Sequence, residues 1–233
     1  MLRLLFLLGY GESTGTPSED GLIIDAETAF DHLVHRADMD KTKVVVFGRS
    51  LGGAVATALT TKHSEEIRGL MIENSFTSIS DMVDQLFPLL RPLKRFILRL
   101  DWKSIQRIGR ITAPILFISG LQDEVVPCDQ MQTLHDAAVG ARFKSMFRIS
   151  NGTHNDSWIK GGPAYLKEMR TFICSCIGAA VPTAAQEAAN EVEDLSLLET
   201  LVMQVQASQA SLSAMSQGQA PQASPPPSSS AST

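Results

Sequence analysis

The sequence predicts an α/β fold in three layers, with a mostly parallel β-sheet covered by helices on both faces. Short apolar segments alternate with longer segments of helical periodicity through the first 178 residues. The short segments are apolar along their whole length, which is typical of parallel strands buried on both faces. The composition, 44% hydrophobic and 19% charged, supplies enough apolar material for one core.

Each element follows from its local pattern. The expected strands run over residues 2–8, 43–48, 67–73, 114–119 and 143–150. The expected helices run over residues 19–36, 51–63, 78–100, 129–138 and 163–177. Ser18 is placed to cap the first helix, since its hydroxyl can accept a hydrogen bond from the first turn. Pro88 and Pro92 should break the helical stretch at 78–100.

Composition and cysteine use restrict the class of protein. The net charge of −5 gives no global reason to bind nucleic acid. The 3 cysteines show no zinc-type spacing, and Cys174 and Cys176 are too close together for a bridge, which indicates reduced thiols and an intracellular compartment. The apolar start is short and lacks a small-residue cleavage site, so we interpret it as a buried strand rather than a signal peptide or a membrane span.

The composition changes sharply near Ala179. Residues 1–178 form the predicted domain, whereas residues 179–233 are rich in Ala, Gln, Ser and Pro and are expected to be a disordered tail. Within the tail, residues 191–206 have apolar side chains at helical spacing and an acidic start. This segment is expected to form at most a transient helix, with binding of a partner as the alternative.

The turn after the strand at 43–48 carries the first chemical signal. Gly48-Arg49-Ser50-Leu51-Gly52 fits the pattern G-x-S-x-G between a strand and a helix, the context that a nucleophile elbow requires. Such a tight turn should strain Ser50 and present its hydroxyl above the sheet. Gly48 and Gly52 lack Cβ atoms, so neighbouring backbone can approach. The N–H of Leu51 would then face an oxyanion at the helix N-terminus.

A serine nucleophile needs a base, and the base needs a carboxylate to orient it. In this fold the order along the chain is Ser, Asp, His. Asp123 follows the strand at 114–119, and His154 lies in a glycine-containing loop after the next strand, so we predict them as acid and base. Glu124 is the second candidate for the acid and Glu73 a more distant one. The remaining histidines are expected on solvated helix surfaces: His32, His35, His63 and His135.

Five segments together resemble a known family. They cover residues 9–15, 47–53, 73–78, 119–127 and 152–158. On these the chain resembles the α/β-hydrolase superfamily, and most of all the small serine hydrolases of the eukaryotic bud-emergence type, which are related to acyl-protein depalmitoylases and are described as serine aminopeptidase-like. The resemblance implies Ser50, Asp123 and His154 as nucleophile, acid and base, and implies no metal or organic cofactor.

The chain departs from this family at its front. Similar proteins carry further strands before the segment at 9–15, with a His-Gly loop that supplies a second oxyanion amide, and often an N-terminal membrane anchor. We therefore expect an N-terminally incomplete fold, in which one strand between those at 2–8 and 43–48 is missing. Since losing one oxyanion donor costs about 10² to 10³ in rate, the expected turnover is weak or absent.

The segment LFPLLRPLKRFILRL, residues 86–100, lies where similar proteins place a cap over the active site. We predict a helical cap over about 78–106. Its basic side chains leave open a second hypothesis, a surface that touches anionic membrane. An ordinary core helix whose basic side chains reach solvent is the third interpretation.

The sequence thus predicts a serine hydrolase for ester, thioester or amide bonds, acting through an acyl-enzyme on a small acyl substrate or an acylated protein. Acyl-protein thioesterase and aminopeptidase activities are both compatible with this prediction. The expected location is cytoplasmic or membrane-associated. The alternative is an inactive hydrolase-like protein that binds partners through its tail.

Overall fold

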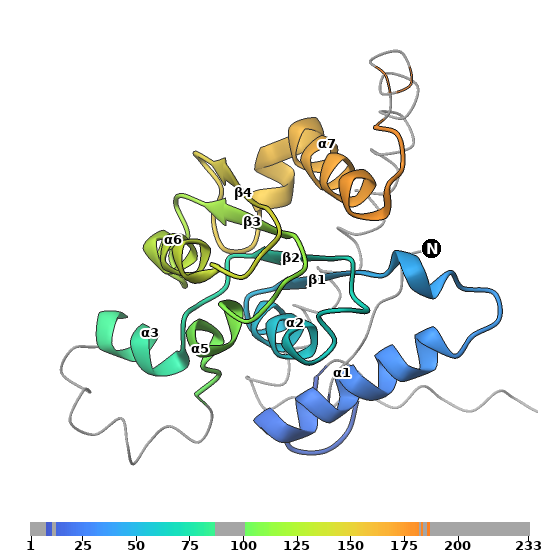
Figure 1. Cartoon of the computed structure of the whole chain (residues 1–233). Helices are drawn as coiled ribbons and strands as arrows, with labels where there is room; N and C mark the ends of the chain where they lie inside the picture. The colour runs from blue at the N-terminus through green and yellow to red at the C-terminus, as the bar shows by residue number, and fades with distance from the viewer. Residues whose placement is uncertain (1–7, 11–12, 87–100, 182, 184–185, 187–233) are drawn as a thin grey trace, which may run out of the picture. The chain divides into compact units, whose positions relative to one another are not determined.

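A computed structural model describes residues 8–10, 13–86, 101–181, 183 and 186 of the 233-residue chain. Its centre is a sheet of four parallel strands in the order β1-β2-β3-β4, as Figure 1 shows. The strands are β1 (Val45–Arg49), β2 (Gly69–Glu73), β3 (Ile115–Gly120) and β4 (Lys144–Ile149). All four lie within two residues of their predicted ends. The strand expected at 2–8 falls almost wholly outside the described residues.

Helices follow the strands along the chain, which confirms the predicted α/β fold. The helices are α1 (Glu19–Val34), α2 (Leu51–Lys62), α3 (Ile79–Leu86), α5 (Ser104–Ile108), α6 (Cys128–Ala137) and α7 (Ser157–Ile177), with a short 3-10 turn η1 (Lys41–Lys43) before β1. Ser18 caps α1 as predicted, because its Oγ accepts a hydrogen bond from the N–H of Gly21 at 3.1 Å.

The strand side chains divide the core into two faces. On β2, Leu70 and Ile72 pack against α2, α5 and α6, whereas Met71 packs against Tyr165 and Phe172 of α7. β3 alternates in the same way, as the period of two along a strand requires. Figure 1 shows α7 on one side of the sheet and α2 and α5 on the other. These are the three predicted layers.

The strands differ in burial. Every residue of β2 and β3 is buried, which explains their unbroken apolar sequences. β1 is less covered: Val45 and Val46 are half-buried and Phe47 is 44% exposed. Within the described part of the chain, β1 pairs with β2 alone.

The helices differ from the predicted ones in two places, and part of one predicted helix lies outside the described residues. α5 begins within the stretch expected as a cap, about 78–106, but continues to Ile108, which is fully buried in the core. α7 begins at Ser157 rather than Pro163, but Gly162 has φ 52 and ψ −139, so a kink precedes the predicted start. Of the helical stretch at 78–100, residues 87–100, which include both prolines, fall outside the described part, as does the tail from residue 187. No described helix combines the length and the apolar character that crossing a membrane requires.

Candidate active site

Ser50 occupies the turn between the end of β1 and the start of α2. Its backbone has φ 52 and ψ −122, a conformation that residues other than glycine rarely adopt. The N–H of Ser50 donates to the carbonyl of Glu73 at 2.9 Å, and the carbonyl of Ser50 accepts from Ser75 Oγ at 2.9 Å. The expected strain is therefore present, and neighbouring backbone and side-chain groups hold it in place.

The glycines around Ser50 contribute unequally. A Cβ on Gly48 would lie 2.1 Å from the carbonyl oxygen of Gly52, so the turn closes only because Gly48 has no side chain. A Cβ on Gly53 would meet the side chain of Ser75 at 2.7 Å. At Gly52 a Cβ would meet nothing within 4 Å. The expectation that Gly52 too must lack a Cβ is therefore wrong: its backbone is the group that approaches Gly48.

The histidine and carboxylate expected from the sequence meet Ser50 at the carboxyl edge of the sheet. His154 Nε2 lies 3.0 Å from Ser50 Oγ, and His154 Nδ1 lies 2.7 Å from Asp123 Oδ2. The other carboxylate oxygen, Oδ1, accepts hydrogen bonds from the N–H groups of Val125 and Val126 at 2.8 and 2.7 Å. With its proton on Nδ1, the imidazole donates to Asp123 and leaves Nε2 free to accept from the serine hydroxyl.

The two alternative carboxylates lie nearby but do not contact the imidazole. Glu124 Oε2 accepts from the backbone N–H of His154 at 3.2 Å. Glu73 is buried at the end of β2, where the hydroxyl of Tyr165 donates to its Oε2 at 2.6 Å. Burial raises the pKa of Glu73 above its ordinary value. The geometry therefore favours Asp123 as the carboxylate that orients His154.

The backbone N–H of Leu51 comes directly after Ser50 in the turn. Leu51 is the first residue of α2, and the first N–H groups of a helix have no acceptor within the helix. An oxyanion formed beside Ser50 would face this end of the helix, where the dipole also favours negative charge. The arrangement can therefore bind the charge that develops when a hydroxyl attacks a carbonyl.

The other histidines make separate local contacts. His32 and His35 are exposed on or beside α1, as expected. His63 and His135 are half-buried rather than solvated: His63 Nδ1 lies 2.8 Å from Glu66, and His135 Nδ1 lies 3.1 Å from Asp136. Among the residues that the structure describes, no three His, Cys, Asp or Glu side chains are grouped to hold a metal ion.

One residue of the site was missed. The side chain of Asn74, directly after β2, bonds to the loops that carry Asp123 and His154. A signal was available, because a polar residue that follows a buried parallel strand lies at the edge where the neighbouring strands also end.

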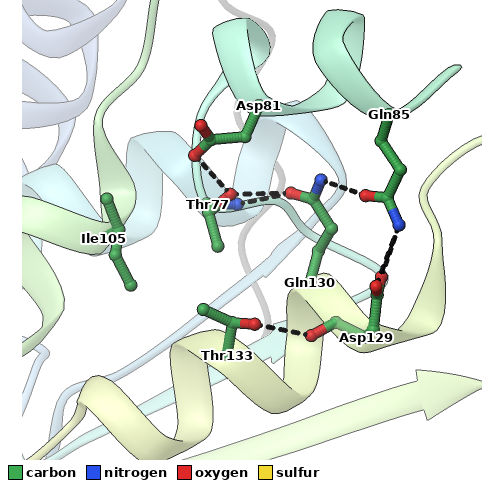
Figure 2. A pocket seen from close by; sticks show the side chains of 7 residues that line it. All are labelled: Thr77, Asp81, Gln85, Ile105, Asp129, Gln130 and Thr133. Carbon is green, nitrogen blue, oxygen red and sulfur yellow. Dashed lines mark hydrogen bonds between the residues drawn. The ribbon is translucent and has the colours of Figure 1, made fainter. Parts of the chain in front are cut away.

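A hollow of about 250 Å³ lies between α3, α5 and α6, away from these side chains (Figure 2). Figure 2 shows a chain of hydrogen bonds along it: Thr77 donates to Gln130, Gln130 to Gln85, and Gln85 to both oxygens of Asp129. Ser50 and His154 do not line it. The polar chain fastens α3, the first part of the expected cap, onto α6.

Comparison with known proteins agrees with the predicted fold. A family model described as "Serine aminopeptidase, S33" matches residues 8–108. The α/β-hydrolase domain-containing protein WAV2 of Arabidopsis thaliana is 42% identical over 73% of this chain and 59% of its own length. Protein bem46 of Schizosaccharomyces pombe is 42% identical over 71% of this chain and 54% of its own. A protein of Saccharomyces cerevisiae described as an uncharacterized membrane protein is 39% identical over 71% of this chain and 57% of its own. The chain thus spans a little over half the length of these relatives.

Solved structures share the fold at low identity. An α/β-hydrolase from Vibrio vulnificus superposes with a TM-score of 0.57 at 21% identity, over 71% of this chain and 61% of that one. A monoacylglycerol lipase from Paleococcus ferrophilus gives a TM-score of 0.53 at 17% identity, over 72% of this chain and 80% of that one. The parallel sheet, the strained serine turn and the relatives lead to one conclusion: the chain belongs to the serine aminopeptidase-like α/β-hydrolases.

Proposed function

We propose that this chain carries the catalytic triad of a serine hydrolase that cleaves ester, thioester or amide bonds. The observation that carries the proposal is the line of two hydrogen bonds from Ser50 through His154 to Asp123, at 3.0 and 2.7 Å. Both distances fall within the range expected of a nucleophile, its base and the group that orients the base.

Each residue has a role that its contacts support. Ser50 Oγ attacks the acyl carbonyl while His154 Nε2 takes the hydroxyl proton. Asp123 orients and stabilises the imidazolium, and the N–H of Leu51 donates to the oxyanion. His154 then passes the proton to the leaving group, and a water molecule activated by the same imidazole hydrolyses the acyl-enzyme. Every proton is returned, so the cycle needs no cofactor.

The proposal specifies the kind of bond that is cleaved and not the molecule that contains it. The chemistry requires an acyl carbonyl that reaches Ser50 Oγ, which a small acyl ester or an acylated side chain of a protein provides. Oxygen, sulfur and nitrogen leaving groups all accept a proton from His154, so the triad by itself does not choose among esters, thioesters and amides.

Labelling with a fluorophosphonate tests the proposal without a known substrate. The probe needs only one reaction with a serine that has an active base, so the wild-type chain should be labelled even where turnover is weak, and Ser50→Ala should not. Ser64→Ala is the matched control, because Ser64 lies after α2 and bonds to Thr112 Oγ1 at 2.8 Å, away from the triad. A folded wild-type chain that resists labelling would overturn the proposal and favour the inactive, partner-binding alternative.

A further inference from the structure

Asn74 combines two unusual features at the carboxyl end of β2. Its φ of 45 lies in the left-handed region, which asparagine tolerates better than most residues but at some cost. Its exposed fraction is 1%. Among the described residues only two others besides glycine have positive φ, Ser50 and Trp102. Strained backbone that persists in a buried place needs surrounding contacts to hold it, and Asn74 has such contacts.

The side-chain amide of Asn74 bonds to two different loops. Its Oδ1 accepts from the N–H of Gly120 at 2.8 Å, where β3 ends and the loop to Asp123 begins. Its Nδ2 lies 3.1 Å from the carbonyl of Thr153 and 3.3 Å from that of His154. It also donates to Ser157 Oγ at 3.0 Å. Because the N–H of Gly120 can only donate and the two carbonyls can only accept, these partners fix which way the amide points.

We propose that Asn74 is a positioning residue for His154, a role that rests on the triad function proposed above. Its amide fixes the position of the histidine loop, residues 150–156 between β4 and α7, relative to the acid loop, residues 121–127 between β3 and α6. Two further links cross between these loops, from the N–H of Gln122 to the carbonyl of Gly152 at 2.9 Å and from the N–H of His154 to Glu124 at 3.2 Å. Asn74 alone among these contacts also joins both loops to β2, the strand whose Glu73 carbonyl accepts a hydrogen bond from the N–H of Ser50.

Removal of the amide leaves buried groups without partners. The N–H of Gly120 loses its acceptor, and the carbonyl of His154 loses its donor, so the loops should shift to find other partners or water. The distance from Nε2 to Ser50 Oγ depends directly on that shift. A displacement of about 1 Å at a catalytic group costs about 10²-fold in rate.

The adjacent residue offers a matched control. Glu73 is also buried at the end of β2, but its hydrogen bond goes to Tyr165 in the body of α7 and not to the histidine loop. Tyr165→Phe therefore removes one buried hydrogen bond between the same strand and the same side of the sheet. A general loosening of this region should affect both variants, whereas misplacement of His154 should affect only the Asn74 variant.

The first measurement is the rate of fluorophosphonate labelling in the full chain. Asn74→Gly is the test variant, because glycine adopts a φ of 45 without strain while the side chain with its amide is removed. We expect labelling about 10²-fold slower than in the wild type, and a rate for Tyr165→Phe equal to that of the wild type. If Asn74→Gly does not fold, Asn74→Asp keeps the size and the acceptor for Gly120 but turns a second acceptor toward two carbonyls, and the same loss is expected at neutral pH.

The second measurement follows His154 without any reaction. In ¹⁵N-histidine-labelled protein, the Nδ1–H signal of His154, assigned by its absence in His154→Gln, should persist in Tyr165→Phe and should shift or vanish in Asn74→Gly. An unchanged signal together with a wild-type labelling rate in Asn74→Gly would overturn the inference. Loss of the signal in a chain whose wild type is never labelled would support the positioning role and would overturn the proposed function instead.

Discussion

The serine turn and the histidine loop hold one side chain each at the same edge of the sheet, but by opposite means. The tight turn at Ser50 closes through groups close in sequence, the absence of a side chain on Gly48 and the backbone of Gly52, and the hydrogen bonds from Ser50 to Glu73 and Ser75 then hold it. His154 depends on residues far away in the chain. Asp123 holds its ring from 31 residues away, and Asn74 holds its carbonyl from 80 residues away.

This difference shows two ways in which the chain fixes the position of a catalytic side chain. The close backbone approach that the serine turn requires is encoded in a few adjacent residues between a strand and a helix. A loop held by long-range hydrogen bonds takes its place only after β2, β3 and β4 have come together. Changes near Ser50 should therefore act on folding and reactivity together, whereas changes around His154 should act on reactivity with less effect on folding.

Asp123→Asn should have the largest effect on reactivity. Asn can keep the local hydrogen bonds to Val125 and Val126 through its oxygen, but it then presents N–H to His154 Nδ1. The imidazole would have to accept there and carry its proton on Nε2, the tautomer that cannot take a proton from Ser50. The same change in a serine protease costs about 10⁴ in rate, and we expect a loss of that order in fluorophosphonate labelling.

The unfolding temperature of Asp123→Asn should stay close to that of the wild type, because the local bonds remain. Glu124→Gln is the matched control, since Glu124 accepts from the backbone of His154 and not from its ring. Labelling that falls more in Glu124→Gln than in Asp123→Asn would identify Glu124 as the acid.

Gly48→Ala should have the next largest effect, and on stability as well as labelling. The added Cβ would lie 2.1 Å from the carbonyl oxygen of Gly52 and 2.8 Å from the nitrogen of Gly53, all backbone atoms that cannot move without opening the turn. Overpacking of this kind typically costs about 1 to 3 kcal/mol in the free energy of unfolding. Urea unfolding and probe labelling should both show the loss.

Gly52→Ala is the control within the same motif. Its Cβ meets nothing within 4 Å, and residue 52 lies in α2, where alanine is favoured over glycine by about 0.5 to 1 kcal/mol. We expect equal or higher stability. A Gly52→Ala variant as unstable as Gly48→Ala would show that the turn does not discriminate between the two glycines.

The same difference between local and long-range constraints decides how much of the site can be predicted from the sequence. The serine turn is visible because its constraint is local: five adjacent residues between a strand and a helix. Asp123 and His154 can be found because strands precede both and the order along the chain restricts the choice. The structure then selects Asp123 over Glu124, a distinction of one position that depends on where the loop places each carboxylate.

The elements that sequence patterns missed are those whose support is tertiary. α5 has five residues, too few for a periodic pattern, and forms where Ile108 enters the core. The part of α7 before the kink, residues 157–161, ends in Gly161, a poor helix former, and is held through Ser157, whose hydroxyl donates to the carbonyl of Thr153 and accepts from Asn74. No pattern near residue 157 points to an asparagine 83 positions earlier.

Ser18→Ala tests a local device that lies outside the site. Ser18 caps α1, and the loss of such a cap costs about 1 kcal/mol in the free energy of unfolding. Since the cap holds only the start of α1, labelling of Ser50 should keep its wild-type rate. Ser175→Ala is the control: Ser175 is exposed and bonds within its own helix to Thr171, so a change below about 0.5 kcal/mol is expected. A slower labelling rate in Ser18→Ala would mean that α1 influences the turn through α2.

Glu73→Gln should have the smallest effect on stability, and the effect should appear only when unfolding is measured at several pH values. Burial raises the pKa of Glu73 in the folded protein above its ordinary value of 4.5, so the folded chain holds a proton that the unfolded chain releases. The stability that this proton contributes is present in full below the ordinary pKa and is lost as the pH rises through the raised one.

Gln keeps the size of the neutral carboxyl and an oxygen that can accept from Tyr165. At low pH the two proteins should therefore be equally stable, and as the pH rises above about 4.5 the wild type should weaken relative to Glu73→Gln. Urea unfolding across that range measures the difference, and parallel curves would show that Glu73 titrates alike in the folded and unfolded chains. Because Glu73 holds the body of α7 and Asn74 holds the histidine loop, a wild-type labelling rate in Glu73→Gln would show that Glu73 does not position His154.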